Sequence, residues 1–134
     1  MMLLPLFLIR KKLLSDSRKL GQWGEKYCQR YLRAKGFVYI AGNFSIRAGE
    51  IDLVMADNKT LVFVEVKTRS SEDFAKAQEA VNQQKRNRII KTAKYFLKKY
   101  NLTDEAFRFD VVTVILGQKG KPQVEHFKKA FRLR

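Results

Sequence analysis

The amino-acid sequence predicts an α/β fold in which a single β-sheet packs against helices. The apolar residues follow helical spacing first, then the pattern of three short strands, then a second helical stretch and two further strands. One sheet covered by helices is the simplest arrangement that buries the apolar side of each of these elements. At 134 residues, with 46% hydrophobic and 31% charged residues, the chain has the composition of one globular domain with its own core.

Residues 1–19 resemble an extension that precedes this domain. Met1–Ile9 is apolar, but it is too short to span a bilayer and lacks the small-residue cleavage site of a secretory signal. Three basic residues at 10–12 follow it, so a weak interfacial anchor is the alternative to a dispensable segment or a start codon assigned too early. We favour the dispensable segment, and we expect Ser15–Lys19 to link it to the first helix.

Helical periodicity begins at Leu20 and continues to Lys35. Apolar side chains recur at steps of three and four, at Leu20, Trp23, Tyr27, Tyr31 and Ala34. Gly36 is a natural C-terminal cap. We expect Phe37–Ile40 to form a short strand that is followed by a turn at residues 41–43, and residues 44–47 to continue that strand or begin the next.

Two short apolar runs predict a β-hairpin. Ile51–Ala56 and Leu61–Val66 are rich in residues that favour strands, and a polar link of residues 57–60 separates them. Asn and Asp suit such a link because they tolerate left-handed backbone and bond to nearby amides. If Asp57 faces Thr60 across a two-residue turn, the numbers of paired residues add up to 117.

This register gives the hairpin one polar face and one apolar face. Asp52 is placed opposite Glu65, and Glu50 opposite Lys67, with all four side chains on the same side because successive side chains alternate. The other face then carries Ile51, Leu53, Met55, Val62, Val64 and Val66 and must be buried.

The two opposed carboxylates point to a metal site. Their Cβ atoms would lie about 4.5–5.5 Å apart, an arrangement that destabilises a sheet unless a cation lies between the charges. Carboxylate oxygens suit Mg²⁺, which proteins hold through one or two carboxylates and substrate phosphate. Lys67 adds a positive charge or, with a lowered pKa, a base. The alternative is an exposed polar face on which Lys67 neutralises Glu50 or Glu65.

Other classes of site are excluded by composition. The single cysteine, Cys28, cannot form an internal disulfide or a zinc cluster, and its helical spacing from Gly24 and Leu32 indicates packing. The single histidine, His126, excludes multi-histidine metal sites and is interpreted as an ordinary strand residue. Any metal would therefore be held by carboxylates, and the cysteine usage fits a cytoplasmic protein.

The second helical stretch, Phe74–Tyr100, is one helix or two pieces broken near Asn82. Its apolar side contains Ile89, Ile90, Ala93, Phe96, Leu97 and Tyr100, and its opposite side contains Arg88, Lys91, Lys94, Lys98 and Lys99. Phe107–Leu116 follows as a strand covered on both faces, beside the Glu65 strand. Gln123–Lys128 alternates like an edge strand. The domain is thus expected at residues 20–128, with a basic tail at 129–134.

The net charge of +15 favours nucleic acid or an anionic membrane surface as the partner. We expect nucleic acid, and a membrane is the less favoured of the two. The basic side of the second helix would supply the phosphate contacts, and its alternative is a merely solvated helix face.

Several motifs together resemble the YraN-like family of small bacterial proteins. They are Gly21-x-x-Gly24-Glu25, Tyr31-Leu32-x-x-x-Gly36, Gly49-Glu50-Ile51-Asp52, Phe63-Val64-Glu65-Val66-Lys67-x-Arg69, Ala77-x-Glu79-Ala80-Val81 with Lys85, and Arg108-Phe109-Asp110-Val111. The resemblance covers about Leu20 to Leu116. Ile51 replaces the proline of the wider pattern, Ala75 stands where a glycine is expected, and Cys28 where a small residue is expected.

The resemblance implies a restriction-endonuclease-like fold, with a mixed central sheet flanked by helices. The family is similar to PD-(D/E)-x-K nucleases, and archaeal Holliday junction resolvases are alike in size and motif order. It implies that Asp52, Glu65 and Lys67 form the catalytic triad, with Glu25 as the first-helix acid. The alternative for Glu25 is an acid that favours the first turn of a helix.

The expected function is metal-dependent hydrolysis of a nucleic-acid phosphodiester, with DNA favoured over RNA and branched or structured DNA as substrate. Asp52 and Glu65 would bind Mg²⁺ or Mn²⁺, together with the Val66 carbonyl and Glu25. Nucleic acid would be held by Arg69, Gln84, Lys85, Arg86, Arg88, Lys91 and Lys94. The alternatives are a catalytically silent nucleic-acid-binding module and a protein-interaction or membrane-peripheral role. A homodimer is compatible with resolvase chemistry, which cuts two strands.

Overall fold

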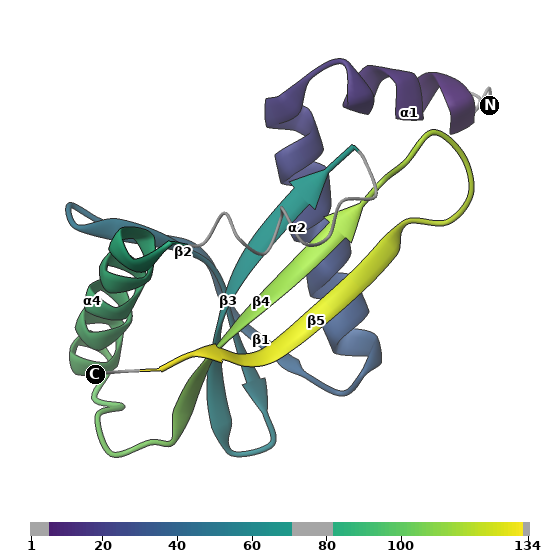
Figure 1. Cartoon of the computed structure of the whole chain (residues 1–134). Coiled ribbons are helices and arrows are strands. Elements are labelled where there is room, and N and C mark those ends of the chain that lie inside the picture. The colour runs from purple at the N-terminus through teal and green to yellow at the C-terminus, as the bar shows by residue number, and fades with distance from the viewer. Residues whose placement is uncertain (1–5, 71–81, 133–134) are drawn as a thin grey trace.

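The computed structural model describes residues 6–70 and 82–132. Within them the chain forms a five-stranded mixed sheet (Figure 1). The strand order follows the sequence, and only β3 and β4 are parallel. The strands are β1 (Val38–Ile46), β2 (Gly49–Asp57), β3 (Thr60–Arg69), β4 (Phe107–Ile115) and β5 (Gln123–Phe131). The α/β prediction with a mixed central sheet is confirmed.

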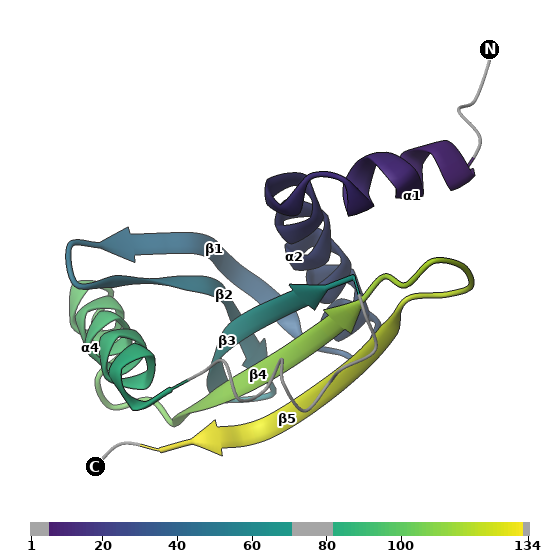
Figure 2. The ribbon, with the colours of Figure 1, turned by 45° about the horizontal axis from the view of Figure 1, so that its top comes forward.

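Helices cover both faces of the sheet. The described residues contain α1 (Leu6–Leu14), α2 (Ser17–Ala34) and α4 (Gln83–Lys99). Helix α2 packs on one face and α4 on the other, beside the β1–β2 arm (Figure 2). The α4-side core includes Phe63, Phe96 and Phe109, whereas the α2-side core includes Leu32 and Val112.

Helix α2 begins earlier than the sequence periodicity predicted. Asp16 accepts hydrogen bonds from the backbone N–H groups of Arg18 and Lys19, at 3.1 and 3.3 Å, and so caps the helix before Ser17. The prediction of a linker at residues 15–19 was therefore wrong. The helix ends where Gly36 takes a φ of +96°, as its sequence predicted.

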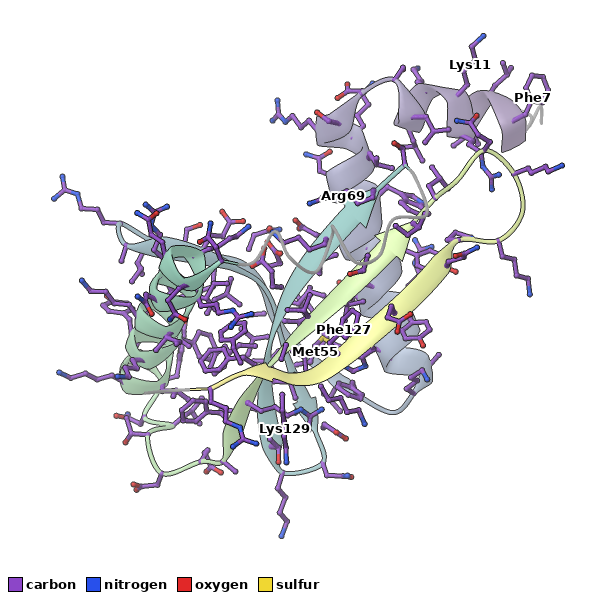
Figure 3. The ribbon with its side chains drawn as sticks, viewed as in Figure 1. Phe7, Lys11, Met55, Arg69, Phe127 and Lys129 are labelled. Atoms are coloured by element: carbon purple, nitrogen blue, oxygen red, sulfur yellow. The ribbon has the colours of Figure 1, made fainter. Side chains whose placement is uncertain are left out.

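The N-terminal extension folds as helix α1 over Leu6–Leu14. It contacts α2, and the Arg10 Nη2 donates to the Gly120 carbonyl at 2.5 Å, in the turn between β4 and β5. Phe7 at its far end is 68% exposed (Figure 3). No helix among residues 6–70 and 82–132 is long and apolar enough to cross a membrane.

Gly24 lets helix α2 approach the sheet closely. A Cβ atom added there would lie 1.9 Å from the Thr68 Oγ1 on β3. Cys28 and Leu32, one and two turns further along α2, are fully buried in the same interface. Packing is therefore the role of Cys28, as predicted.

The turn predicted at residues 41–43 was wrong, because β1 is continuous from Val38 to Ile46. A β-bulge between Tyr39 and Ala41 absorbs the irregularity, and Asn43 adopts a φ of +51° within the strand. Asn tolerates this backbone through its short polar side chain, so the same composition that predicted a turn is accommodated inside a strand.

The β2–β3 hairpin has the predicted register over the length that is paired. Asp57 pairs with Thr60, and Leu53 pairs with Val64, which is the last pair before the strands separate. Glu50 therefore does not lie opposite Lys67, as we had expected, but pairs with Ser45 on β1.

The separation of the strands also changes one buried face. Leu53, Met55, Val62, Val64 and Val66 lie in the α2-side core as predicted. Ile51 was assigned to that face but packs in the α4-side core. Beyond Leu53 the strand follows β1 and no longer keeps its alternation relative to β3.

Asn82 caps helix α4, which begins at Gln83. Its side chain accepts a hydrogen bond from the Lys85 backbone N–H at 2.9 Å. This agrees with the predicted break near Asn82. Residues 71–81, which include the first part of the predicted Phe74–Tyr100 helix, lie outside the described residues. The predicted apolar side of α4 is buried except for Ile90, which is partly buried, and Tyr100, which is 49% exposed.

Strand β4 is buried on both faces from Phe109 to Ile115, as its continuous apolar character predicted. Strand β5 extends to Phe131, three residues beyond the predicted end at Lys128. The extension depends on a bulge in which Lys129 has a φ of +52° and donates its backbone N–H to Asp110. Half of the predicted basic tail is thus part of the sheet.

Candidate active site

A cavity of about 470 Å³ opens where β2 separates from β3, below the N-terminus of α4. Of the three carboxylates predicted to bind metal, Asp52 and Glu65 line it and Glu25 does not. The lining residues are Gly49, Glu50, Asp52, Glu65, Asn82, Gln84, Lys85, Arg88 and Ile89. Residues from the hairpin and from the basic helix therefore meet at one place.

Asp52 occupies the fork between the two strands. Its Oδ2 accepts the backbone N–H of Val66 at 2.8 Å, one residue beyond Glu65. The carboxylate thus takes over a β3 amide that regular pairing with β2 would have used. This bond holds Asp52 beside Glu65, although the backbone ladder has already ended.

Glu65 is shared by two lysines. Its Oε1 lies 3.2 Å from the Lys67 Nζ and 3.1 Å from the Lys85 Nζ. Glu65 and Lys67 are buried, at 7% and 6% exposure, so the exposed polar face of the alternative is wrong, although the neutralisation of Glu65 by Lys67 that it predicted is present. The Lys85 side chain is 41% exposed and reaches in from the first turn of α4.

The two lysines differ in how readily they lose a proton. Burial lowers the pKa of Lys67, and the hydrogen bond with Lys85 lowers it further, while Glu65 opposes the change. For Lys85, burial also disfavours the charge, but the hydrogen bond with Lys67 and the charge of Glu65 outweigh it and raise the pKa. Lys67 is therefore the better proton acceptor of the two, and Lys85 the more persistent cation.

Negative charge accumulates around the cavity. Burial, followed by the charge of Glu65, raises the pKa of Asp52 to about 8, although the Val66 N–H opposes the shift. The pKa of Glu25 is raised as well, by burial and then by the charge of Glu50, while a hydrogen bond from Asn43 opposes it. Such mutual repulsion is relieved by a bound cation or by protonation.

Glu25 projects toward this group from α2. Because the helix starts at Ser17, Glu25 lies in its middle, and the alternative of a first-turn acid is wrong. Burial, then the charge of Glu50 and, to a smaller extent, that of Glu65 raise the pKa of Glu25. Three elements, α2, β2 and β3, thus each contribute acid to the same region.

The donor set fits a hard divalent ion that also binds substrate. Within residues 6–70 and 82–132, no three acidic, histidine or cysteine side chains converge closely enough to hold a metal by themselves. Mg²⁺ commonly uses only one or two carboxylates and completes its shell with water and phosphate. Asp52 and Glu65 meet that requirement.

Some of the predicted nucleic-acid contacts lie elsewhere. Gln84, Lys85 and Arg88 line the cavity, but Lys91 and Lys94 line a separate cleft of about 210 Å³ on the other side of α4. The Arg86 guanidinium lies 5.5 Å from the centre of the Phe131 ring.

Arg69 also lies outside the cavity. It is the last residue of β3, at the end of the strand that points toward α1 and away from α4 (Figure 3). Its Nη1 donates to the Thr68 carbonyl at 2.9 Å. The residues predicted as one phosphate-binding set are therefore spread over at least two faces of the molecule.

A buried polar network on β4 was not predicted from the sequence. Asp110 is fully buried and accepts from the Arg108 Nε at 3.0 Å, and its Oδ2 lies 2.7 Å from the His126 Nε2. Arg108 also donates to Asp57 at 3.0 Å. His126 is thus a network member and not an ordinary strand residue. In the sequence, the only signal for its partner Asp110 was an acidic residue within the apolar run Phe107–Leu116.

Comparison with known proteins finds a family model that matches the part of the chain carrying Asp52, Glu65 and Lys67. A model described as "Uncharacterised protein family UPF0102" matches residues 24–114. A UPF0102 protein from Pelotomaculum thermopropionicum is 40% identical over 120 residues, covering 88% of this chain and all of the relative. One from Geotalea uraniireducens is 39% identical, covering 89% and 94%. One from Solibacter usitatus is 42% identical, covering 83% and 84%.

Proposed function

The chain belongs to the UPF0102 (YraN) family, a branch of the restriction-endonuclease-like nuclease superfamily, and from this premise we propose that it is a metal-dependent nuclease. The reaction would be hydrolysis of a nucleic-acid phosphodiester, with structured or branched DNA as the substrate. The observation that supports it is that Asp52 and Glu65 line one cavity together with cationic side chains of α4. The Lys67 Nζ, whose pKa is lowered by burial, lies 3.2 Å from Glu65.

Each residue has a role that follows from its surroundings. Asp52 and Glu65 would hold Mg²⁺ or Mn²⁺, with the Val66 carbonyl and Glu25 as further donors. When bound, the ion supplies positive charge to the phosphate and lowers the pKa of water. Lys67 accepts the proton of the attacking water, because its buried amine gives up its own proton most readily.

The cationic wall positions the substrate. Lys85 keeps its charge and is exposed enough to move from Glu65 to a phosphate oxygen. Arg88 lies beside it on the cavity wall. Both contacts are to phosphate, so the proposed recognition is of backbone shape rather than of base sequence.

A catalytically silent binding module is the second candidate. One observation favours it, since Lys67 and Lys85 both form ion pairs with Glu65 and neutralise its charge. In that case the cavity would bind nucleic acid but would not turn it over. The two candidates predict different results with the same variant.

The test is a cleavage panel with Asp52→Asn. The protein is incubated with Mg²⁺ or Mn²⁺ and with single-stranded, duplex, flap and four-way DNA and RNA, and cleavage is followed on gels. The nuclease proposal predicts cleavage that falls by more than about 100-fold in Asp52→Asn. The matched control is Asp104→Asn, an exposed acid in the loop after α4, which should cleave like wild type.

Calorimetry with Mg²⁺ and Mn²⁺ provides a second readout. The Asp52→Asn variant should lose ion uptake and yet melt no lower than wild type, because the environment of Asp52 disfavours its charge. Nucleic-acid binding without cleavage across the whole panel would support the silent module. Cleavage that survives in Asp52→Asn would refute the proposed site.

A further inference from the structure

A second cavity, of about 380 Å³, lies between the start of β4 and the end of β5. It contains none of the residues that line the candidate active site. Its lining residues are Phe107, Arg108, Phe109, Lys129, Phe131 and Arg132, and we call it the phenylalanine pocket. Lys129 and Arg69 lie near opposite ends of the sheet (Figure 3).

Three aromatic rings form its apolar part. The rings of Phe109 and Phe131 are stacked, with centroids 4.8 Å apart and planes at 16°. Phe107 meets Phe109 edge to face at 5.9 Å and 87°. Phe109 and Phe131 are buried at 2% and 8% exposure, whereas Phe107 is only partly buried. Phe107 is therefore the ring that can meet a ligand, and the other two hold it in place.

The shape of the pocket is built by the bulge in β5. The Lys129 N–H donates to the Asp110 Oδ1 at 3.1 Å, and the register shift there brings Phe131 opposite Phe109. Asp110 is fully buried and is oriented by Arg108 and by His126. A bulge fixed by a buried carboxylate is a costly local feature that commonly serves to redirect side chains.

The charge at the rim of the pocket is positive. Arg108 is paired with Asp57 and Asp110, each at 3.0 Å, so its charge is balanced within the protein. The exposed side chains of Lys129 and Arg132 stand beside the rings. Arg132 also lines the neighbouring cleft with Lys91 and Lys94.

The first turn of α4 connects the pocket with the candidate active site. Lys85 reaches Glu65 at 3.1 Å, while the next residue, Arg86, places its guanidinium 5.5 Å from the Phe131 ring. Cationic side chains thus follow one another from the cavity at Glu65 to the rim at Arg132. A flexible phosphate backbone can follow such a path.

We propose that the phenylalanine pocket holds an unpaired base of a single-stranded segment, whose phosphates contact Lys129 and Arg132. The inference rests on the proposed function and specifies its substrate as nucleic acid with an unpaired strand. Bases in a duplex are stacked and cannot reach a partly buried ring, whereas unpaired bases stack readily on aromatic side chains. The combination of rings and cations suits this ligand better than it suits an apolar peptide.

The test measures binding without cleavage. Fluorescence anisotropy in EDTA compares a labelled oligothymidylate with a blunt duplex of equal phosphate number, at several salt concentrations. Phe107→Ala should weaken single-strand binding about 5- to 100-fold and change duplex binding less than about twofold, while Phe107→Trp should retain single-strand binding.

A surface variant makes the test independent of core packing. Arg132→Ala should lower the salt dependence of single-strand binding by about 0.7 log units per decade, the value for one lost phosphate contact. The control Lys119→Ala, an exposed lysine in the turn between β4 and β5, should bind oligothymidylate like wild type. Thermal melting verifies that every variant is folded.

The outcomes separate this inference from the nuclease proposal. Because the binding measurement in EDTA involves no divalent ion, failure of the cleavage panel would leave a positive binding result standing. Equal losses on single strand and duplex in Phe107→Ala, or no loss in either Phe107→Ala or Arg132→Ala, would overturn the pocket alone. A wild-type protein that binds neither ligand would overturn the pocket proposal, and the nuclease proposal would still be decided by the cleavage panel.

Discussion

Replacing Gly24 with alanine tests the contact that holds α2 against β3. The added Cβ would lie 1.9 Å from the Thr68 Oγ1 and 2.7 Å from the Thr68 Cβ. Rotation of the threonine side chain can move Oγ1 away but not the Cβ, which the strand fixes. To bring the Thr68 Cβ from 2.7 Å to an ordinary contact of 3.4 Å, the helix would have to move from the strand by about 0.7 Å at this point.

Such overpacking costs about 1–3 kcal/mol, and we expect the upper end because both elements are anchored along their length. For a domain of this size, 3 kcal/mol corresponds to a fall in Tm of roughly 10 °C, measurable by circular dichroism. The displacement would also move the neighbouring Glu25 away from the candidate active site. Gly24→Ala should therefore lower any metal-dependent cleavage together with stability.

The same helix offers a control of opposite sign. A Cβ atom at Gly21 would meet nothing within 4 Å, and alanine is the better helix former. Gly21→Ala should therefore raise the stability by about 0.5–1 kcal/mol. The double variant Gly24→Ala/Thr68→Ala should recover part of the loss, since two of the three closest atoms are removed. A Gly24→Ala protein that melts at the wild-type temperature would refute the packing argument.

Two further predictions concern charged groups. Burial alone would raise the pKa of Asp110, but the hydrogen bonds from His126 and Arg108 outweigh it and hold the pKa below its ordinary value of 3.8. Its stabilising contribution is therefore complete above about pH 4 and is lost as the pH falls through the folded-state pKa. Asp110→Asn should lower the free energy of unfolding by about 3–5 kcal/mol at pH 7, measured by urea denaturation, because Arg108 loses one of its two carboxylate partners. The gap in unfolding free energy between the variant and wild type should narrow on acidification. A gap of constant size between pH 7 and pH 3 would contradict this account. Lys85→Ala should tighten Mg²⁺ binding about fivefold by calorimetry, because one of two ammonium groups on the Glu65 Oε1 is removed and a half-exposed pair is worth about 1 kcal/mol. Weaker Mg²⁺ binding in this variant would show that the lysine does not compete with the ion.

The parts of the fold that depend on neighbours in sequence were predictable. A two-residue turn after Asp57 fixed the β2–β3 register, and spacing of three and four residues identified the buried side of α4. That register also predicted that Asp52 and Glu65 would lie close together, although the ladder ends one pair before them and a side-chain bond to the Val66 N–H holds Asp52 there. Turn geometry and side-chain alternation are local properties, so a single sequence carries them.

The parts that depend on distant segments were not predictable. The ladder between β2 and β3 ends at Leu53, while β2 stays paired with β1 as far as Gly49. The extension of β5 to Phe131 includes a bulge whose Lys129 N–H is bound by Asp110 on β4. Neither leaves a periodic trace in the sequence. The missed role of His126 has the same cause, since its partner is sixteen positions away along the chain.

The parallel pairing of β3 with β4 has a consequence for the newborn protein. Leu61 pairs with Phe107 and Arg69 with Ile115, so β3 has no partner on that side until residues 107–115 have left the ribosome. Closing so long a loop is slow compared with forming the hairpin that precedes it. The acidic residues of β2 and β3 therefore leave the ribosome long before α4 and β4 can pack against them. We expect the candidate site to be inactive until β4 has paired with β3.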